Sequence, residues 1–258
     1  MPRPSAPPPG DAARRNRPVR WLAGGAGRSS RRPRILIDGL DLSGKTTLTD
    51  ALLTMCAAQG TAAVRHRGML AEHHPLEKLL KRLPLAHQYE SSGITTAYLV
   101  GGGFALDALL VRVDPPRCGD AVLVQEGYVD RTMAVGLAGG PFLSAALALW
   151  AARYFAAFDV AVYVHASPEA RRARMLRRQR VDVGDRNSVE EGFAGRFNSA
   201  LLHHLGRRHH TVLVFDTEQY TPQEMARQIL SVAGLLSEET QRPSGDGFEL
   251  VGPATPAS

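Results

Sequence analysis

Short apolar runs alternate with longer segments of helical periodicity through the central part of the chain. Runs that are apolar at consecutive positions are typical of strands covered on both faces. Their alternation with helical segments predicts βαβ units and a parallel sheet. The five strands that we expect are Arg34–Asp38, Ala62–His66, Ala121–Glu126, Val160–His165 and Thr211–Phe215.

Three helices have recognisable starts. Ser167 is a candidate N-cap followed by Pro168, and Thr221–Glu224 has the pattern of a capping box. Pro141 precedes a long apolar segment that predicts a third helix. Its large apolar residues fall on nearly one face, so we expect them in the core: Leu143, Leu147, Trp150 and Tyr154.

A glycine-bounded loop follows the first expected strand. Gly39, Gly44, Lys45 and Thr46 have the G-x-x-x-x-G-K-[ST] spacing of a phosphate-binding loop, or P-loop. Glycine lets backbone amides converge on an anion, and the helix that starts near Lys45 points its free N–H groups at the same place. The strand before the loop and the amphipathic helix after it separate this motif from a chance match. The residues expected at the phosphates are Gly39, Leu40, Asp41, Leu42, Ser43, Gly44, Lys45, Thr46 and Thr47.

Such a loop predicts ATP and Mg²⁺ as cofactors. The Lys45 ammonium would reach the β- and γ-phosphates, and the Thr46 hydroxyl would join the Mg²⁺ ligands. The loop alone leaves open whether the phosphoryl group passes to water, to a protein or to a small molecule.

Two other expected strands end in charged side chains, and ligands of open α/β sheets lie beyond such strand ends. Arg65 and Arg67 flank one end, where planar guanidinium groups could hold a phosphate of the acceptor. Glu126 ends another strand and could bind Mg²⁺ or act as a base toward an attacking hydroxyl. The pair Asp130-Arg131 is a second candidate for the functional acidic motif.

An arginine-rich segment follows the helix that starts at Ser167. Arg177, Arg178, Arg180 and Arg186 surround Val181–Arg186, which we expect to be a loop between two helices. A solvated basic surface is one interpretation. We prefer a lid around residues 177–190 that closes over the donor, with Arg178 and Arg180 neutralising charge on the transferred phosphoryl group.

Composition adds limits to this picture. The chain contains no apolar run of about 18 residues, so we expect no membrane span, and its two cysteines suit a reducing, cytoplasmic location. Residues 1–34 carry nine arginines against Asp11 alone, a net charge of +8, so the other 224 residues carry −2. The positive charge belongs to the tail and not to the folded body. We therefore do not expect the folded body to bind nucleic acid.

The expected organisation has one domain between two tails. Residues 1–32 are rich in Arg, Pro and Gly, and residues 239–258 are rich in Pro and Gly, so we expect both to be disordered. A targeting peptide and a nucleic-acid-binding arm are the other interpretations of the first tail. The folded domain is expected at residues 33–238.

Taken together, the motifs resemble the thymidylate kinase family of P-loop kinases over roughly Arg34–Ala233. The stretch Ile37–Thr47 is close to the family's phosphate loop. Arg65–Gly68 stands where the family has Arg-Glu-Pro-Gly, and Glu126–Asp130 resembles its Asp-Arg-Tyr-Val-Asp stretch, with Gly127 in place of the arginine. The resemblance implies a three-layer α/β domain with a five-stranded parallel sheet in the order 2-3-1-4-5.

The resemblance also implies the activity: ATP-dependent phosphoryl transfer to a nucleoside monophosphate, dTMP or a related nucleotide. It places Lys45, Glu126, Arg131, Arg178 and Arg180 in catalysis. It is compatible with a homodimer. The residues expected to bind the acceptor are Arg65, Arg67, Tyr98 and Tyr128.

The acceptor side departs from the family, because residues 98–107 contain no arginine where the family uses one to hold thymidylate. Glu126 resembles the glutamate with which deoxynucleoside kinases deprotonate an acceptor hydroxyl. A kinase for a nucleoside or another small molecule is therefore the alternative, and a nucleotide-hydrolysing switch is a more remote one.

Overall fold

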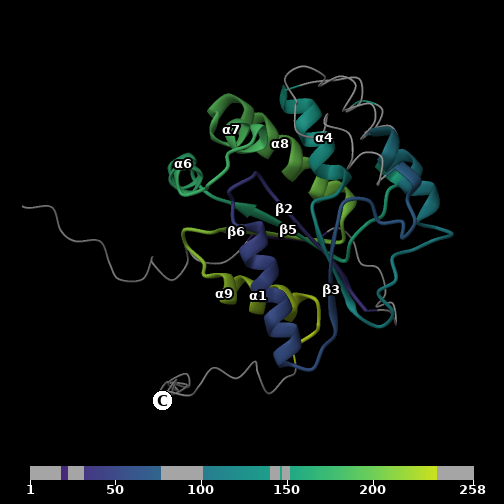
Figure 1. Ribbon diagram of the computed structural model, residues 1–258. Coiled ribbons are helices and arrows are strands. Elements are labelled where there is room, and N and C mark those ends of the chain that lie inside the picture. The colour runs from purple at the N-terminus through teal and green to yellow at the C-terminus, as the bar shows by residue number, and fades with distance from the viewer. Residues whose placement is uncertain (1–18, 23–31, 77–100, 140–145, 147–151, 237–258) are drawn as a thin grey trace, which may run out of the picture.

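The computed structural model describes residues 19–22, 32–76, 101–139, 146 and 152–236, which are built around one six-stranded sheet (Figure 1). From one edge to the other its order is β3-β4-β2-β5-β6-β1. The first five strands are parallel and the last pair is antiparallel. The strands are β1 Val19–Leu22, β2 Arg34–Asp38, β3 Ala63–Arg67, β4 Val122–Glu126, β5 Val160–His165 and β6 Thr211–Asp216.

The five parallel strands confirm the predicted α/β fold and its strand order 2-3-1-4-5, counted along the predicted strands. Each predicted strand differs from the observed one by no more than one residue at either end. The phosphate loop follows β2, which lies in the middle of this sheet. Side chains at the ends of β3 and β4 therefore lie on one side of the loop, and those at the ends of β5 and β6 lie on the other.

The prediction that residues 1–32 are disordered is wrong for Val19–Leu22, which form β1. This strand pairs with β6, from Val19 opposite Val214 to Leu22 opposite Thr211. An edge strand presents a row of unpaired N–H and C=O groups, and β1 supplies partners for them. The composition of the segment gives no sign of this pairing because the partner strand is almost 200 residues away.

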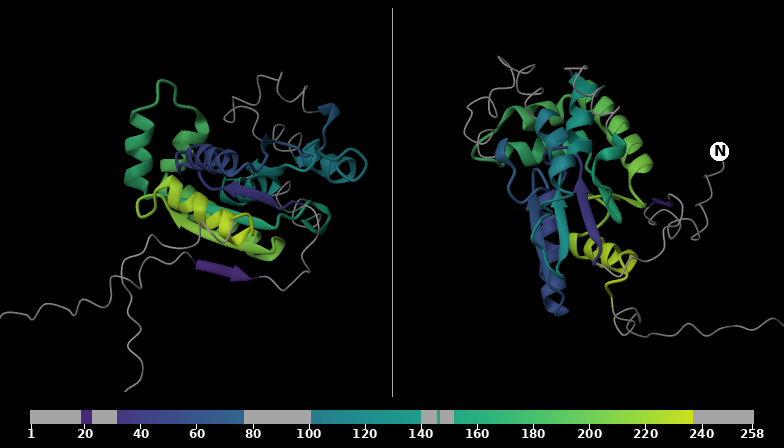
Figure 2. Two further views of the ribbon diagram at one scale, coloured as in Figure 1. Left: turned by 90° about the horizontal axis from the view of Figure 1, so that it is seen from below. Right: turned by 90° about the vertical axis from the view of Figure 1, so that its right-hand side faces the viewer.

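Helices cover both faces of the sheet, which gives the three layers (Figure 2). Helices α1 (Lys45–Ala58) and α9 (Pro222–Val232) lie side by side on one face. Helices α4 (Val129–Gly139) and α8 (Glu191–Arg208) lie together on the other. The alternation of side chains along β2 divides the core accordingly: Ile35 faces α1 and α9, whereas Leu36 belongs to the cluster beneath α4 and α8.

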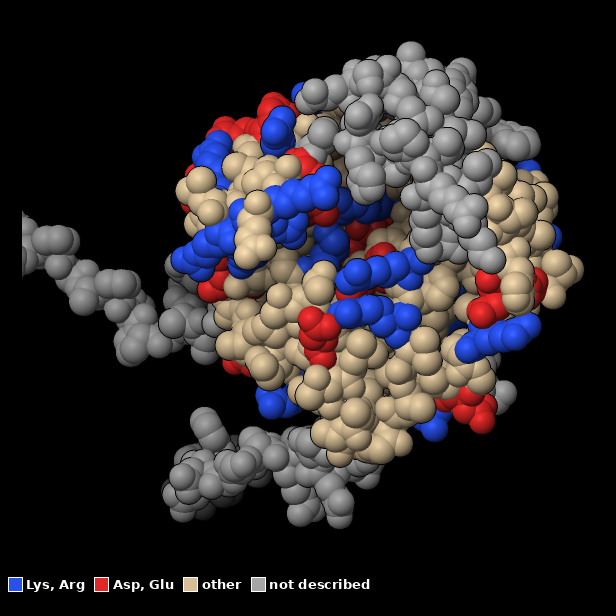
Figure 3. All heavy atoms as spheres, in the orientation of Figure 1, with Lys and Arg blue, Asp and Glu red and all other residues tan. Residues whose placement is uncertain are grey.

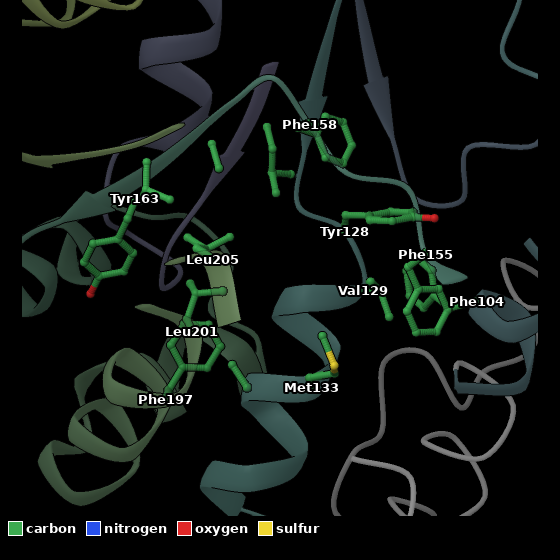
Figure 4. Close-up of a cluster of buried hydrophobic side chains, with 14 of the residues drawn as sticks. Phe104, Tyr128, Val129, Met133, Phe155, Phe158, Tyr163, Phe197, Leu201 and Leu205 are labelled. Atoms are coloured by element: carbon green, nitrogen blue, oxygen red, sulfur yellow. The ribbon is translucent and has the colours of Figure 1, made fainter. Parts of the chain in front are cut away.

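The core beneath α4 and α8 is rich in aromatic rings (Figure 4). The ring of Tyr128 packs edge-on against Phe104 and Phe158, at centroid distances of 5.3 and 5.7 Å. Its hydroxyl donates to the buried Asp107 carboxylate at 2.7 Å, so the phenol is both buried and satisfied. Asp107 also accepts from the backbone N–H of Ala71, which fixes the chain beyond β3 to the helix over residues 101–110.

Two of the three predicted helix starts are confirmed. Ser167 caps α6 (Pro168–Leu176) by accepting from the N–H of Ala170, and Thr221 forms the expected capping box with Glu224 at α9. The segment expected to form a helix after Pro141 lies almost entirely outside the described residues, which contain only Ala146 and a short 3₁₀ helix, Ala152–Tyr154. The expectation that Tyr154 lies in the core is wrong, because this residue is 42% exposed. No helix of the described part of the chain is both long and apolar enough to cross a membrane.

The segment Val181–Arg186, which we expected to be a loop, is helical for most of its length. Helix α7 (Val183–Val189) begins in it, because Asp182 and Asp185 form a capping box that the sequence analysis missed. The loop of the arginine-rich segment is thus confined to the residues between α6 and Asp182.

A buried charged cluster joins α4 to the end of α8. The carboxylate of Asp130 is fully buried and accepts hydrogen bonds from the Arg208 guanidinium and, at 3.3 Å, from Nε2 of His209. Nδ1 of His209 accepts from the N–H of Phe158, which leaves the proton on Nε2. Burial opposes ionisation of Asp130, but the charges and hydrogen bonds of Arg208 and His209 together outweigh it and hold the pKa of the carboxyl well below its usual value.

We expect Asp130→Asn to lower the free energy of unfolding by about 3 kcal/mol near neutral pH, because it leaves a buried guanidinium without its counter-charge. Urea unfolding at pH 7 measures the effect. Asp50→Asn is the matched control: it removes an exposed carboxylate paired with Arg65 and should change stability by no more than about 0.5 kcal/mol. Equal effects of the two substitutions would show that the buried cluster contributes no more than a surface pair.

Candidate active site

The phosphate loop adopts a backbone conformation that requires its glycines. Gly39 and Gly44 have φ of 151° and 105°, in the region that other residues avoid. A Cβ at position 39 would lie 2.3 Å from the carbonyl oxygen of Val164, so the loop passes directly against the end of β5. Leu42 also has a positive φ, of 65°, and a positive φ in a branched residue is strain of the kind found at ligand sites.

The N-terminus of α1 is open toward a ligand. Gly44 is its N-cap residue, and no side chain caps the helix there. The N–H groups of the first turn and the positive end of the helix dipole therefore face the same space as the loop. Thr46 and Thr47 in this turn are exposed, and their hydroxyl groups are accessible from the cleft described below.

The ammonium of Lys45 contacts the loop itself. It donates to the carbonyl oxygens of Gly39 at 2.9 Å and Leu40 at 2.6 Å, and it lies 3.5 Å from the Asp41 carboxylate. Burial lowers the pKa of Lys45 to about 8, and the nearby Arg131 guanidinium acts in the same direction. The ammonium is thus held at the mouth of the loop, where an incoming phosphate would meet it.

A second cation reaches the loop from α4. Arg131 donates from Nη1 to the carbonyl oxygen of Gly39 and from Nη2 to Oδ2 of Asp41, both at 2.5 Å. Its guanidinium carbon lies 5.8 Å from the centre of the Phe197 ring on α8. Although burial opposes it, the Arg131 and Lys45 charges lower the pKa of Asp41. Asp41 is therefore an anion between two cations.

The backbone conformation explains the glycine at position 127. Gly127 has a φ of 66°, in the left-handed region that favours glycine. A Cβ there would lie 3.5 Å from Cδ of Arg131, an ordinary van der Waals contact. Arg131, in the first turn of α4, thus packs beside Gly127.

This arrangement separates the two residues of the Asp130-Arg131 pair. Asp130 points into the core toward Arg208, and Arg131 points to the phosphate loop. Asp130 is therefore a structural residue, and the hypothesis that it is the functional acid of the site is wrong. Of the two acidic candidates, only Glu126 lies at the strand ends.

Asp38 at the end of β2 is a buried carboxylate with one unsatisfied oxygen. Its Oδ1 accepts from the N–H of Gly39 at 2.7 Å, and Nη1 of Arg131 lies 3.9 Å away. Its Oδ2 is buried without a hydrogen-bond partner among the described residues. Burial raises the pKa of Asp38 to about 6, with Arg131 and Lys45 opposing the shift. Sequence analysis missed this residue, although an acid that ends a buried strand was a visible signal.

The expected acceptor arginines surround Glu126. Nη2 of Arg67 lies 2.6 Å from Oε2 of Glu126, and Nε of Arg65 lies 3.2 Å from Oε1 without hydrogen-bond alignment. Arg65 also pairs with Asp50 on α1. The Glu126 side chain is 7% exposed and that of Arg67 is 55% exposed. The structure thus brings these three residues together, with one carboxylate between two guanidinium groups.

The buried amide of Gln125 holds the ends of β3 and β4 together. Its Nε2 donates to the carbonyl oxygens of Gly68 at 2.9 Å and Gly127 at 2.8 Å, and its Oε1 lies 2.9 Å from Nδ1 of His66. One side chain therefore connects the ends of β3 and β4, which carry Arg67 and Glu126.

The arginine-rich segment lies over the phosphate loop (Figure 3), where basic side chains gather around a hollow at the strand ends. Arg178 pairs with the buried Asp185 of α7 at 2.7 Å, and Arg180 is exposed. Arg174, which sequence analysis missed, donates to the carbonyl oxygen of Leu42 at 2.8 Å and to the hydroxyl of Thr217 at 2.9 Å. It lies one helical turn before Arg178, a spacing that could have indicated it.

A cleft of about 510 Å³ opens at the phosphate loop. One wall is the loop with the start of α1, and the other walls come from the arginine-rich segment and from the chain between β6 and α9. Its volume suits a nucleotide-sized ligand. Its lining residues are Asp41, Leu42, Gly44, Lys45, Thr46, Thr47, Arg174, Arg178, Thr217, Tyr220, Pro222 and Met225.

Two expected acceptor residues are not part of this arrangement. Tyr128 is 2% exposed and lies in the aromatic core, so the hypothesis that it contacts the acceptor is wrong. Tyr98 lies outside the described residues. Among the described residues, no group of three or more His, Cys, Asp or Glu side chains is placed to hold a metal ion by itself.

Comparison with known proteins supports the fold. Neither protein-family profiles nor curated protein sequences give a significant match. Among solved structures, the chain is similar to thymidylate kinase from Candida albicans, with a TM-score of 0.54 and 14% sequence identity over 80% of this chain and 93% of that one. That protein is described as having broad substrate specificity. The likeness shows that this chain has the fold of a P-loop nucleotide kinase.

We expect Asp38 to make stability fall as pH rises. Its pKa in the folded protein is about 6, above the unfolded value of about 3.9, so the folded state holds a proton that the unfolded state has lost between these values. Below about pH 4, Asp38 makes its full contribution to the free energy of unfolding, up to about 3 kcal/mol. This contribution is lost as the pH rises through about 6.

Urea unfolding of the wild type and of Asp38→Asn, at steps from pH 4 to pH 7.5, measures this contribution. Asparagine keeps an oxygen for the N–H of Gly39 but cannot ionise. The wild type should lose stability relative to the variant as pH rises, and parallel profiles for the two proteins would contradict the assignment.

Proposed function

We propose that this chain is an ATP-dependent kinase that transfers a phosphoryl group to a nucleoside monophosphate, dTMP or a related nucleotide. One observation carries the proposal: Asp41 lies between Lys45, on the donor side of the phosphate loop, and Arg131, which comes from the acceptor side. A donor phosphate at the loop would thus lie next to cations that reach in from both sides. Phosphoryl transfer needs such positioned cations more than it needs covalent chemistry.

The donor is proposed to occupy the cleft of about 510 Å³. The open first turn of α1 would bind its phosphates, as would the Lys45 ammonium after exchanging the loop carbonyls for phosphate oxygens. The base would lie toward Tyr220 and Met225, which are among the less polar residues of the lining. Arg174 and Arg178 are placed to meet the phosphates from the opposite wall.

Mg²⁺ fits this site. The Thr46 hydroxyl is exposed at the cleft, and the phosphates of a nucleotide supply most of the oxygen ligands that Mg²⁺ requires. When bound, the ion would neutralise charge that develops on the transferred group. Glu126, the other expected ligand, is already compensated by Arg65 and Arg67, so a role in metal binding would require one of these pairs to open.

The acceptor is proposed to bind beyond the ends of β3 and β4. A monophosphate would bring negative charge to Arg65, Arg67 and Arg131, which already lie within reach of carboxylates. The phosphate oxygens could replace Glu126 as the partner of Arg67, whose side chain is more than half exposed. Three guanidinium groups at one edge favour a charged acceptor over a neutral one.

The alternative is a nucleoside kinase. It is favoured by the position of Glu126, which has a buried Oε1 without an aligned hydrogen-bond donor. In that reading Arg65 and Arg67 would hold the glutamate in place, and Glu126 would take a proton from an acceptor hydroxyl.

Acceptor-dependent release of ADP tests the proposal directly. We expect ADP formation from ATP and Mg²⁺ to rise at least about 100-fold on addition of a suitable monophosphate. Lys45→Ala should reduce that turnover by a similar factor without unfolding the protein, because the lost ammonium lies at the proposed β- and γ-phosphates. Steady ADP release without an acceptor would instead indicate a hydrolytic switch.

Matched nucleoside and monophosphate acceptors separate the two kinases. For a monophosphate, Arg65→Ala should raise the KM of the acceptor by about 10- to 150-fold, the equivalent of one charge-assisted pair of about 1.5–3 kcal/mol. For a nucleoside, Glu126→Gln should lower kcat by about 10²–10⁴, and Arg65→Ala should leave KM unchanged.

The matched control is Arg207→Ala, which removes an exposed arginine at the end of α8. It should change neither constant. An Arg65→Ala enzyme with unaltered acceptor KM, alongside a Glu126→Gln enzyme with a low kcat, would overturn the nucleotide proposal in favour of the nucleoside one.

A further inference from the structure

Helix α7 of the lid lies unusually close to the phosphate loop. Gly184 is the second residue of this seven-residue helix. A Cβ at position 184 would lie 2.6 Å from Oδ2 of Asp41 and 3.6 Å from its Cγ. Cβ atoms do not approach oxygen so closely, so a side chain at 184 would require either the Asp41 carboxylate or α7 to move.

Close approach is the only evident reason for glycine at this position. Gly184 has no positive φ, so the backbone does not require it. Glycine has a lower helix propensity than alanine, by up to about 1 kcal/mol in a helix interior. The short helix thus carries a poor helix former at a point where it approaches the phosphate loop.

Asp41 cannot simply turn away from α7. Its Oδ2, the atom nearest to Gly184, accepts from Nη2 of Arg131 at 2.5 Å, and its Oδ1 lies 3.5 Å from the Lys45 ammonium. A rotation of the carboxylate would break the contact with Arg131. Because that contact would be lost, we expect a side chain at 184 to displace α7 instead.

Hydrogen bonds and an ion pair connect α6 and α7, so a displacement at Gly184 would move both helices. Asp185 caps α7 and also pairs with Arg178. The buried Arg171 of α6 donates to the carbonyl oxygen of Ser188 at 2.7 Å and to that of Ala166. These contacts link α6 and α7 to the end of β5, next to the phosphate loop.

We propose that Gly184 is a positioning residue that seats the lid on Asp41, and that this contact couples lid closure to Arg131 and Lys45. Asp41 then contacts three elements at once: the lid, α4 and the start of α1. The lid is in place when Asp41 holds both cations at the loop. The contact between Gly184 and Asp41, which we call the seat, is inferred from the geometry alone. Its effect on turnover rests on the proposed kinase function.

Hydrogen exchange of α7 amides in the ligand-free protein tests the seat, because two effects of Gly184→Ala have opposite signs. Higher helix propensity alone would slow exchange about fivefold, the equivalent of about 1 kcal/mol. Loss of the seat should instead speed exchange at least about tenfold. Gly195→Ala is the matched control: it lies in α8, and a Cβ there would meet nothing within 4 Å.

A second variant distinguishes Asp41 from Asp182, whose Oδ1 would lie 3.2 Å from the same Cβ. In an Asp41→Ala background the obstructing carboxylate is absent, so Gly184→Ala should no longer speed exchange of α7 and should slow it. Slower exchange for Gly184→Ala in the wild-type background, or faster exchange that persists in the Asp41→Ala background, would overturn the proposal.

Turnover supplies the last readout. With ATP and an active acceptor, Gly184→Ala should lower kcat at least about tenfold and change the KM for ATP less than about threefold, because an unseated lid affects the transfer step more than donor binding. An unchanged kcat would contradict the proposed coupling of lid closure to Arg131 and Lys45. If no acceptor supports turnover in the wild type, the proposed function fails, while the exchange experiment still decides the seat.

Discussion

The carboxylate of Asp41 and the neighbouring carbonyl oxygen of Gly39, which carries a partial negative charge, are the groups on which the site depends. They hold two cations that would otherwise repel each other: Lys45 from the first turn of α1 and Arg131 from the first turn of α4. The buried Asp38 lies next to them with its pKa raised to about 6, so it can bind a proton near neutral pH. Charge at the loop is therefore balanced without a ligand, and an incoming phosphate exchanges partners rather than meeting bare cations.

This balance is possible because elements from distant parts of the chain meet at β2. The fold places the loop between two groups of strand ends, and Gly39 lets it lie directly against β5. Arg131 reaches it from the first turn of α4, and Arg174 reaches it from α6 and donates to the carbonyl oxygen of Leu42. The strained φ of Leu42 is thus supported by a hydrogen bond from a helix more than 130 residues away.

Much of the fold could be predicted from sequence because local signals and burial agree. Strands covered on both faces read as continuous apolar runs, and caps such as Ser167 and Thr221 mark helix starts by their own side-chain chemistry. The strand β1 could not be found in this way, since it depends on pairing with the edge of β6. The start of α7 was predicted as a loop because Gly184 disfavours a helix, yet the capping box of Asp182 and Asp185 starts one there.

The candidate site could be predicted where a sequence motif fixes the backbone geometry. It was harder to predict where the role of a residue depends on the direction of its side chain. The spacing of Gly39 to Thr47, with the strand before it and the helix after it, predicted a loop that needs its glycines, and Gly39 and Gly44 do have positive φ. In the neighbouring residues 126–131, a helix start at Val129 turns Asp130 into the core and Arg131 toward the loop, while Tyr128 faces the aromatic cluster. Adjacent residues of a helix point about 100° apart, so a shift of one position in the helix start would turn both side chains away from their observed partners. The placement of Asp130 in the core and of Arg131 at the loop is thus set by where α4 begins.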